Sequence, residues 1–141
     1  MIEFEVVGSP AAQGSKKHVG GGRMVEMAKG HKPWRDAVAH AARDIANTID
    51  DAPLDGALML TVEFRFPMPT SRRKVVRDAG RCPKISAPDL DKAIRAVGDA
   101  LQAGGLIRDD ARLCEIHASK VEVIGWTGAI IRLAGVDEVT L

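Results

Sequence analysis

The sequence predicts a single small α+β domain, in which a mixed β-sheet is packed against two main helices. Segments with alternating apolar residues indicate strands, and segments with apolar residues at every third or fourth position indicate helices. These segments follow one another in the order β-α-β-α-β-β, roughly, which is typical of helices packed on a mixed sheet. The chain has 141 residues, the usual size of one domain. We therefore expect one domain over residues 1–141.

The amino-terminal part of the chain contains one predicted strand and one predicted helix. Ile2–Val7 alternates apolar and acidic residues, as in a half-buried strand. Residues 8–30 are rich in Gly, Ser and Lys and predict a long mobile loop, with a short hairpin around His18–Met27. Pro33 suits the first turn of a helix, and the apolar residues that follow keep helical spacing through Ile49.

The rest of the chain predicts three more strands and the second helix. Ala57–Phe66 alternates most regularly, with Thr61, Glu63 and Arg65 on the polar side. Residues 67–87 carry three prolines and many basic residues, and we expect a second mobile loop there. A helix follows over Asp89–Ala103, and its apolar stripe faces the sheet. The last two strands are expected at Leu113–Val123 and Ala129–Leu133.

Composition narrows the class of protein. A hydrophobic content of 45% is enough for a core, and a net charge of +1 neither favours nor excludes a nucleic-acid partner. The two cysteines are 32 positions apart and match no zinc-binding spacing. No charged leader opens the chain, and no apolar run approaches the length of a membrane span. We expect no membrane association and a location in the cytoplasm of a bacterial host cell.

Three aspartates lie where the predicted fold can bring them together. Asp89 and Asp91 open the helix 89–103, and Asp110 follows Gly104-Gly105, a pair that can stop a helix and reverse the chain. The helix rises roughly 21 Å at about 1.5 Å per residue, and an extended return to Asp110 covers roughly 20 Å. The third carboxylate therefore comes back beside the first two. Such oxygen donors suit Mg²⁺ or Mn²⁺, which offsets their mutual repulsion.

Other sites share the Asp-x-Asp spacing. A calcium-binding EF-hand loop needs a glycine and then a glutamate where Ile94 and Ala100 stand, so that site is excluded. An aspartyl phosphotransferase usually places the pair after a buried strand, and residues 82–86 form a poor strand. A sugar-nucleotide site stays open, although the chain is short for it.

A purely structural role is also open for these acids. Asp89 could cap the helix by accepting backbone N–H bonds, and Asp91 in the first turn would favour the helix dipole. Asp109 and Asp110 could be ordinary turn residues. Spacing by itself does not choose between these roles and a metal site.

A longer motif surrounds the three aspartates. Pro88-Asp-Leu-Asp-Lys-Ala-Ile-Arg-Ala-Val-Gly-Asp-Ala-Leu101, followed by Gly105-Leu-Ile-Arg-Asp-Asp-Ala-Arg-Leu113, resembles the signature of RusA-type Holliday junction resolvases. These are crossover-junction endodeoxyribonucleases common in bacteriophages and prophages. The pattern is Asp-x-Asp, a basic residue four positions later, Asp-Ala-Leu, and Asp-Asp before a strand. The order of elements and the early Gly-Ser-Pro followed by basic residues, at 8–17, fit the same family.

The resemblance implies that Asp89, Asp91 and Asp110 are metal-binding catalytic carboxylates, and Asp109 matches the neighbouring acid. The chain departs from the family where Asn and then a catalytic Lys are usual, because Lys92 and Arg95 stand there. A guanidinium does not deprotonate, so we expect Arg95 to grip the scissile phosphate and stabilise the pentavalent state without transferring a proton. Lys92 would partly take the place of the missing lysine.

Basic residues surround the acidic motif. Residues 70–95 contain eight Lys or Arg against three acids, two of which are proposed metal ligands. Basic loops can also be ordinary solvated surface, but this surplus leads directly into the acidic site. We expect DNA to contact Lys16, Lys17, Arg72, Arg73, Lys74, Arg77 and Lys92.

These observations predict a Mg²⁺-dependent, structure-selective endodeoxyribonuclease, with Mn²⁺ as a substitute ion. It would resolve four-way junctions and related branched DNA by paired symmetric nicks. The resemblance implies a homodimer, which presents two equivalent sites to two equivalent strands. One alternative is a DNA-binding module of a phage or mobile element that has lost nuclease activity through the departures at Lys92 and Arg95. Another is an unrelated metal enzyme that processes nucleotides.

Overall fold

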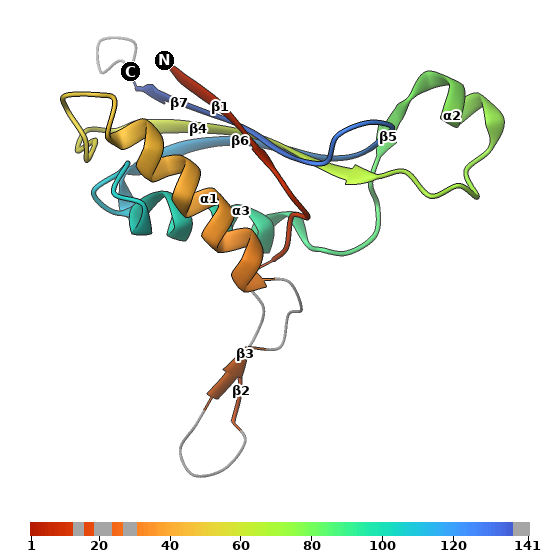
Figure 1. Ribbon diagram of the computed structural model, residues 1–141, viewed down its shortest axis with the longest axis horizontal. Helices are drawn as coiled ribbons and strands as arrows, with labels where there is room; N and C mark the ends of the chain where they lie inside the picture. The colour runs from red at the N-terminus through yellow and green to blue at the C-terminus, as the bar shows by residue number, and fades with distance from the viewer. Residues whose placement is uncertain (13–15, 19–23, 27–30, 137–141) are drawn as a thin grey trace.

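The computed structural model describes residues 1–12, 16–18, 24–26 and 31–136, and it confirms a single α+β domain with a mixed sheet (Figure 1). Much of the loop expected at 8–30 therefore lies outside the described residues. The main sheet has five strands in the order β1-β7-β4-β6-β5. Their bounds are Ile2–Val7 for β1, Gly128–Gly135 for β7, Leu58–Pro67 for β4, Leu113–Val123 for β6 and Arg81–Pro83 for β5.

The two long central strands, β4 and β6, run parallel, and the other neighbouring pairs of the main sheet are antiparallel. A parallel pair needs a crossover connection, and here the chain between β4 and β6 contains a helix that lies across the sheet. The register places Phe64 opposite Lys120 and Phe66 opposite Glu122. A lysine and a glutamate of β6 therefore share the face of the sheet on which the phenylalanines of β4 lie.

Helices α1 (His31–Ala46) and α3 (Leu90–Ala103) cover one face of the main sheet (Figure 1). Alternate residues of β4 point toward them, as its sequence predicts, while Thr61, Glu63 and Arg65 line the opposite face. The apolar side of α3 is buried from Ala96 to Leu101 and partly buried at Leu90 and Ile94, because it packs against both the sheet and α1. The core includes Trp34, Val38, Leu60, Val62, Phe64, Val97, Leu101, Leu106, Ile107, Ile131 and Leu133.

The two helices approach most closely where α3 ends. Gly104 is the C-terminal cap of α3, and the Nη2 atom of Arg43 donates to the carbonyl of Ala103 at 3.1 Å. A Cβ added at Gly104 would lie 2.5 Å from the carbonyl oxygen of Ala39 and 2.8 Å from the Cβ of Ala42. Gly104 is therefore required by the closeness of the two backbones, since its φ of −76° suits any residue.

Several local predictions need correction. The segment 67–87 is not only loop, because it contains the short helix α2 (Lys74–Ala79) and strand β5. Asp110 begins a 3₁₀ helix, η1 (Asp110–Arg112), and does not end an extended segment. Helix α1 ends at Ala46, three residues before the expected Ile49. The expected hairpin is formed by β2 (Lys16–His18) and β3 (Met24–Glu26). Within the described ranges, no helix is both long enough and apolar enough to cross a membrane.

We predict that Gly104→Ala lowers the free energy of unfolding by about 1–3 kcal/mol, because a methyl group there pushes α3 away from α1. Urea denaturation followed by circular dichroism measures the change. Gly56→Ala is the matched control, since a Cβ at Gly56 meets nothing within 4 Å. Equal stability of the two variants would show that the helices yield without cost.

Candidate active site

The Asp89–Asp91 pair lies at the amino-terminal end of α3. Asp89 occupies the N-cap position, but its carboxylate makes no capping hydrogen bond. The side chain of Asp89 is 67% exposed and lies 3.8 Å from the Nζ atom of Lys92. Asp91, in the first turn of the helix, is exposed as well. The structural role open to Asp89 as a capping side chain is therefore not used, and both carboxylates remain accessible to a ligand.

Asp110 lies against the middle of α3. The backbone N–H of Asp110 donates to the Oε1 atom of Gln102 at 3.1 Å. A Cβ added at Gly98 would lie 3.7 Å from the Cβ of Asp110, which is an ordinary van der Waals distance, so η1 lies directly against the helix at this position. Two backbone hydrogen bonds hold the chain that leads to Asp110. The N–H of Leu54 donates to the carbonyl of Leu106, and the N–H of Arg108 donates to the carbonyl of Leu54.

The two neighbouring acids of the Asp-Asp motif differ in what they contact. The carboxylate of Asp109 caps η1 by accepting the backbone N–H of Ala111 at 3.0 Å, and it lies 3.7 Å from Arg112. Arg112 is also paired with Asp55 at 2.9 Å, so Asp109 belongs to a set of contacts that shapes the turn. Asp110 is exposed beside α3. The structure thus separates a turn-forming acid from one that faces solvent.

The proposed catalytic groups follow one side of α3. Arg95 lies one turn after Asp91, and Gly98, which lies against Asp110, comes seven residues after Asp91 on the same face. Seven residues correspond to about 10 Å along the helix axis. Asp110 therefore returns only partway toward the start of α3. Arg95 is exposed between the two levels, where it can reach an anion.

The carboxylates fit a hard cation by their chemistry, since Mg²⁺ and Mn²⁺ prefer oxygen donors. The structure does not bring the carboxylates of Asp89, Asp91 and Asp110 together around one point. Across residues 1–12, 16–18, 24–26 and 31–136, no three His, Cys, Asp or Glu side chains lie close enough together to hold a metal ion. The shared metal site of Asp89, Asp91 and Asp110 therefore stays a prediction.

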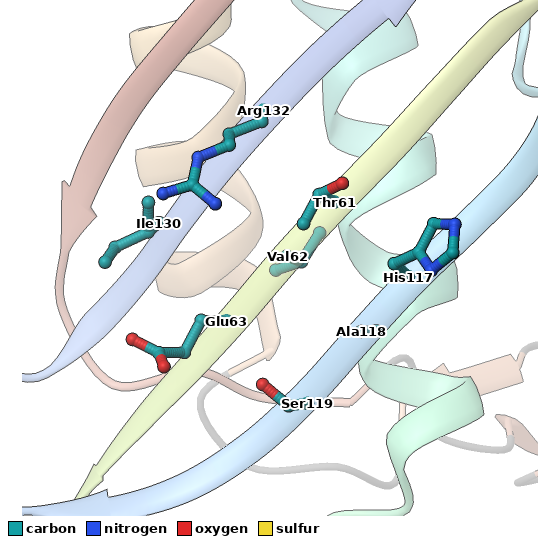
Figure 2. A pocket seen from close by; sticks show the side chains of 8 residues that line it. All are labelled: Thr61, Val62, Glu63, His117, Ala118, Ser119, Ile130 and Arg132. Carbon is teal, nitrogen blue, oxygen red and sulfur yellow. The ribbon is translucent and has the colours of Figure 1, made fainter.

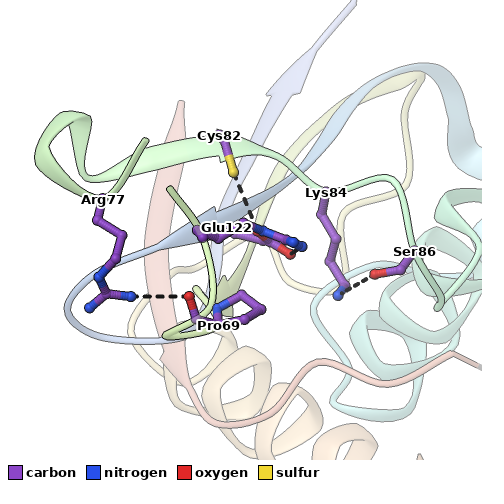
Figure 3. A network of polar contacts seen from close by, with 7 residues as sticks. Pro69, Arg77, Cys82, Lys84, Ser86 and Glu122 are labelled. Carbon is purple, nitrogen blue, oxygen red and sulfur yellow. Dashed lines mark hydrogen bonds and ion pairs between the residues drawn. The ribbon is translucent and has the colours of Figure 1, made fainter. Parts of the chain in front are cut away.

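The basic residues predicted to contact DNA have different surroundings. Arg73 is exposed, and Lys74 forms an exposed ion pair with Asp78 at 2.7 Å. Arg77 donates to the carbonyl of Pro69 at 3.0 Å, a bond that ties α2 to the segment before it (Figure 3). Lys92 lies beside Asp89, as described above. Lys16 and Lys17 fall in β2, and their side chains lie outside the described part of the structure.

Arg72 differs from its neighbours because it binds a buried glutamate. Its Nε and Nη2 atoms donate to the two carboxylate oxygens of Glu122 at 2.7 and 2.8 Å. Glu122 is 1% exposed, and it also accepts a hydrogen bond from the thiol of Cys82 (Figure 3). The bonds from Arg72 outweigh burial and lower the pKa of Glu122 from 4.5 to about 2. Burial, followed by the bond to Glu122, raises the pKa of Cys82.

A separate hollow of about 310 Å³ lies on the face of the sheet turned away from α1 and α3 (Figure 2). Its charged side chains are paired with one another or with residues at its rim. Arg132 binds Glu3 at 2.8 Å, and Glu63 binds both Arg81 and Arg65. Burial raises the pKa of Glu63, but the hydrogen bonds from these two arginines lower it overall. This hollow is therefore a salt-bridged surface, remote from the aspartates of α3.

Two residues of β6 were not predicted from the sequence, although the strand carries a signal for them. Ile116, Ala118, Lys120 and Glu122 alternate along β6, and the register places them on the face that the helices cover. A lysine and a glutamate on such a face are informative, because charged residues there need partners. Glu122 finds Arg72, and Lys120 donates two hydrogen bonds to the chain that leads into α3.

Comparison with known families gives one match. The family model described as Endodeoxyribonuclease RusA matches residues 4–133. The match includes all of β4, β5, β6, α1, α2, α3 and η1, and it leaves out two residues at one end of β1 and two at one end of β7. Among curated proteins, no relative matches the chain.

We predict that Arg72→Met lowers the free energy of unfolding by about 2 kcal/mol at neutral pH, because it leaves the Glu122 carboxylate buried without its partner. The pKa of Glu122 is depressed, so its stabilising contribution is complete above 4.5 and is lost as pH falls toward about 2. The difference between wild type and variant should therefore shrink over that interval.

Urea denaturation at a series of pH values measures this difference. Arg73→Met, which changes the adjacent exposed arginine, is the matched control and should unfold like the wild type. A stability loss in Arg72→Met that stays constant down to the lowest pH would contradict the assignment to Glu122.

Proposed function

The chain belongs to the RusA endodeoxyribonuclease family, and from this we propose that it is a Mg²⁺-dependent nuclease that resolves Holliday junctions and related branched DNA. The family match over 130 consecutive residues, 4–133, carries the proposal. The state of Asp89 supports it, because a helix N-cap whose carboxylate accepts no capping bond leaves that carboxylate for another use.

We assign Asp89, Asp91 and Asp110 as the residues that hold the metal ion. Once bound, Mg²⁺ supplies an activated water and screens the charge of the scissile phosphate. Arg95 stabilises the negative charge that builds on the phosphate, from its exposed position one turn after Asp91. A guanidinium keeps its proton at any ordinary pH, so Arg95 acts as an electrostatic clamp. Asp109 shapes the turn through its bond to Ala111.

Junction resolution also needs symmetry. A four-way junction offers two equivalent strands for cutting, and a single chain offers one set of these residues. We propose that the active form is a twofold homodimer, since twofold symmetry supplies two equivalent sites. Paired nicks at symmetric positions on a synthetic junction, in Mg²⁺ and not in EDTA, are the expected product.

We predict that Asp91→Asn and Asp110→Asn each lower the rate of junction cleavage by more than a hundredfold, because even residues behind a metal ligand contribute about 10–100-fold. Asp109→Asn should retain cleavage within about tenfold, since its carboxylate serves the turn. Single-turnover cleavage of a labelled junction measures all three. Asp36→Asn, on the exposed surface of α1, is the control.

The same variants separate the proposed nuclease from a binding module. Asp91→Asn should bind the junction as tightly as the wild type in EDTA. Wild-type protein that binds the junction but cuts in no divalent metal would identify a non-catalytic module. Full cleavage by Asp91→Asn, or a larger loss in Asp109→Asn than in Asp110→Asn, would show that the carboxylates are wrongly assigned.

We predict that replacing Arg73 and Lys74 together with Ala weakens junction binding and flattens its log–log salt dependence by roughly 1.8, about 0.9 for each phosphate that the variant no longer neutralises. Arg72 is left intact because it holds Glu122. Fluorescence anisotropy over a range of salt concentrations, in EDTA, gives the slope. A double change of Lys32 and Arg132 removes the same charge elsewhere and should leave the slope unchanged. An unaltered slope in the first variant would remove α2 from the DNA interface.

A further inference from the structure

Lys120 joins β6 to the chain that leads into α3. Its Nζ atom donates to the carbonyl oxygens of Ser86 and Pro88, each at 2.8 Å. Its own carbonyl accepts the backbone N–H of Lys84 at 3.1 Å. A single residue of β6 thus holds residues 84, 86 and 88 in succession, and Asp89 follows directly.

These contacts lie where the backbone leaves the sheet. Strand β5 ends at Pro83, and the backbone N–H of Lys84 still bonds to the carbonyl of Lys120 before the chain turns toward α3. The carbonyls of Ser86 and Pro88 are therefore outside any strand or helix. An ammonium group suits this position, because it carries three donors on a long stem and can bind two carbonyls at once.

The bond to Pro88 bears directly on Asp89. The carbonyl of Pro88 and the amide nitrogen of Asp89 belong to one planar peptide unit, so a fixed carbonyl oxygen also fixes the orientation of that unit. The carbonyl of Asp89 in turn accepts the N–H of Ala93 and starts α3. The Lys120 ammonium thus limits the positions available to the Asp89 carboxylate and to the first turn that carries Asp91.

We propose that Lys120 is a positioning residue for the Asp89–Asp91 pair, an inference that rests on the proposed metal-dependent function. It contacts backbone carbonyls and acts through the acids that follow them. Neighbouring Lys84 has other partners. Its Nζ atom contacts the hydroxyl of Ser86 (Figure 3). The same atom lies over the ring of Phe66, 5.0 Å from its centroid.

Lys120→Met keeps the apolar stem and removes the donors, and Lys120→Arg restores both charge and donors. Lys32→Met, which removes an exposed lysine from an ion pair on α1, is the matched control. Two measurements on the protein without DNA report the role independently of cleavage. Hydrogen exchange follows the amides of residues 89–93, and electron paramagnetic resonance follows the binding of Mn²⁺.

Lys120→Met should exchange faster at residues 89–93 while α1 stays protected, and its affinity for Mn²⁺ should fall about 10–100-fold. Cleavage should need correspondingly more Mg²⁺. Lys120→Arg should bind Mn²⁺ within about threefold of the wild type, and Lys32→Met should match it. A lysine that only stabilises the fold would lower the unfolding temperature without changing Mn²⁺ affinity below that temperature, and this result would overturn the proposal.

Lys120→Gln serves if the Met variant does not fold, because it keeps a polar side chain but removes the ammonium group that bridges the two carbonyls. Wild-type Mn²⁺ affinity in a folded Gln variant would also overturn the proposal. Failure of the positioning role is distinct from failure of the proposed function. If the wild type binds Mn²⁺ and cuts junctions and the variants do the same, only the role of Lys120 falls. If the wild type neither binds Mn²⁺ nor cuts, both fall together.

Discussion

The packing of α3 on the sheet determines where every proposed catalytic group lies. Its apolar side is buried between β4, β6 and α1, so the helix has no freedom to rotate without exposing Val97 and Leu101. With the buried side fixed, Asp91 and Arg95 must face solvent on the opposite side. The 3₁₀ helix η1 lies against Gly98, on the same side of α3 as Asp91. The hydrophobic core thus orients the acidic residues without touching them.

Strand β6 connects the two halves of the proposed site. β6 begins directly after η1, which carries Asp110. Lys120 lies ten residues after Asp110 and holds the backbone before Asp89. Two residues further on, Glu122 anchors the basic segment through Arg72. Asp110, the start of α3 and the basic segment around Arg72 are therefore all connected to β6. Every residue of β4 pairs with β6, so these three parts share one rigid support.

Periodicity predicted the strands and helices that bury one side in the core. It failed for the segments whose structure depends on long-range polar contacts. β1, β4 and α3 follow their apolar patterns, because each buries one side. The pattern of α2 and β5 is too short to read, and the ion pair that holds them joins residues 50 positions apart. The return to Asp110 is shorter than an extended chain allows, because the N–H groups of Gly105 and Leu106 bond back to the end of α3. A linear pattern does not show which residues such polar contacts join.

The departures at positions 92 and 95 gain a physical interpretation from these contacts. Lys92 lies 3.8 Å from Asp89, and Lys120 is bound to two carbonyls, so both nearby ammonium groups have partners on the protein. Arg95 is the exposed cation on the side of α3 that carries Asp91. In the proposed reaction the phosphate therefore meets a guanidinium, which offers a broad set of donors and no proton. Three cations therefore have three separate roles in the proposed reaction. Lys120 holds the backbone before the acids, Lys92 pairs with Asp89, and Arg95 binds the phosphate.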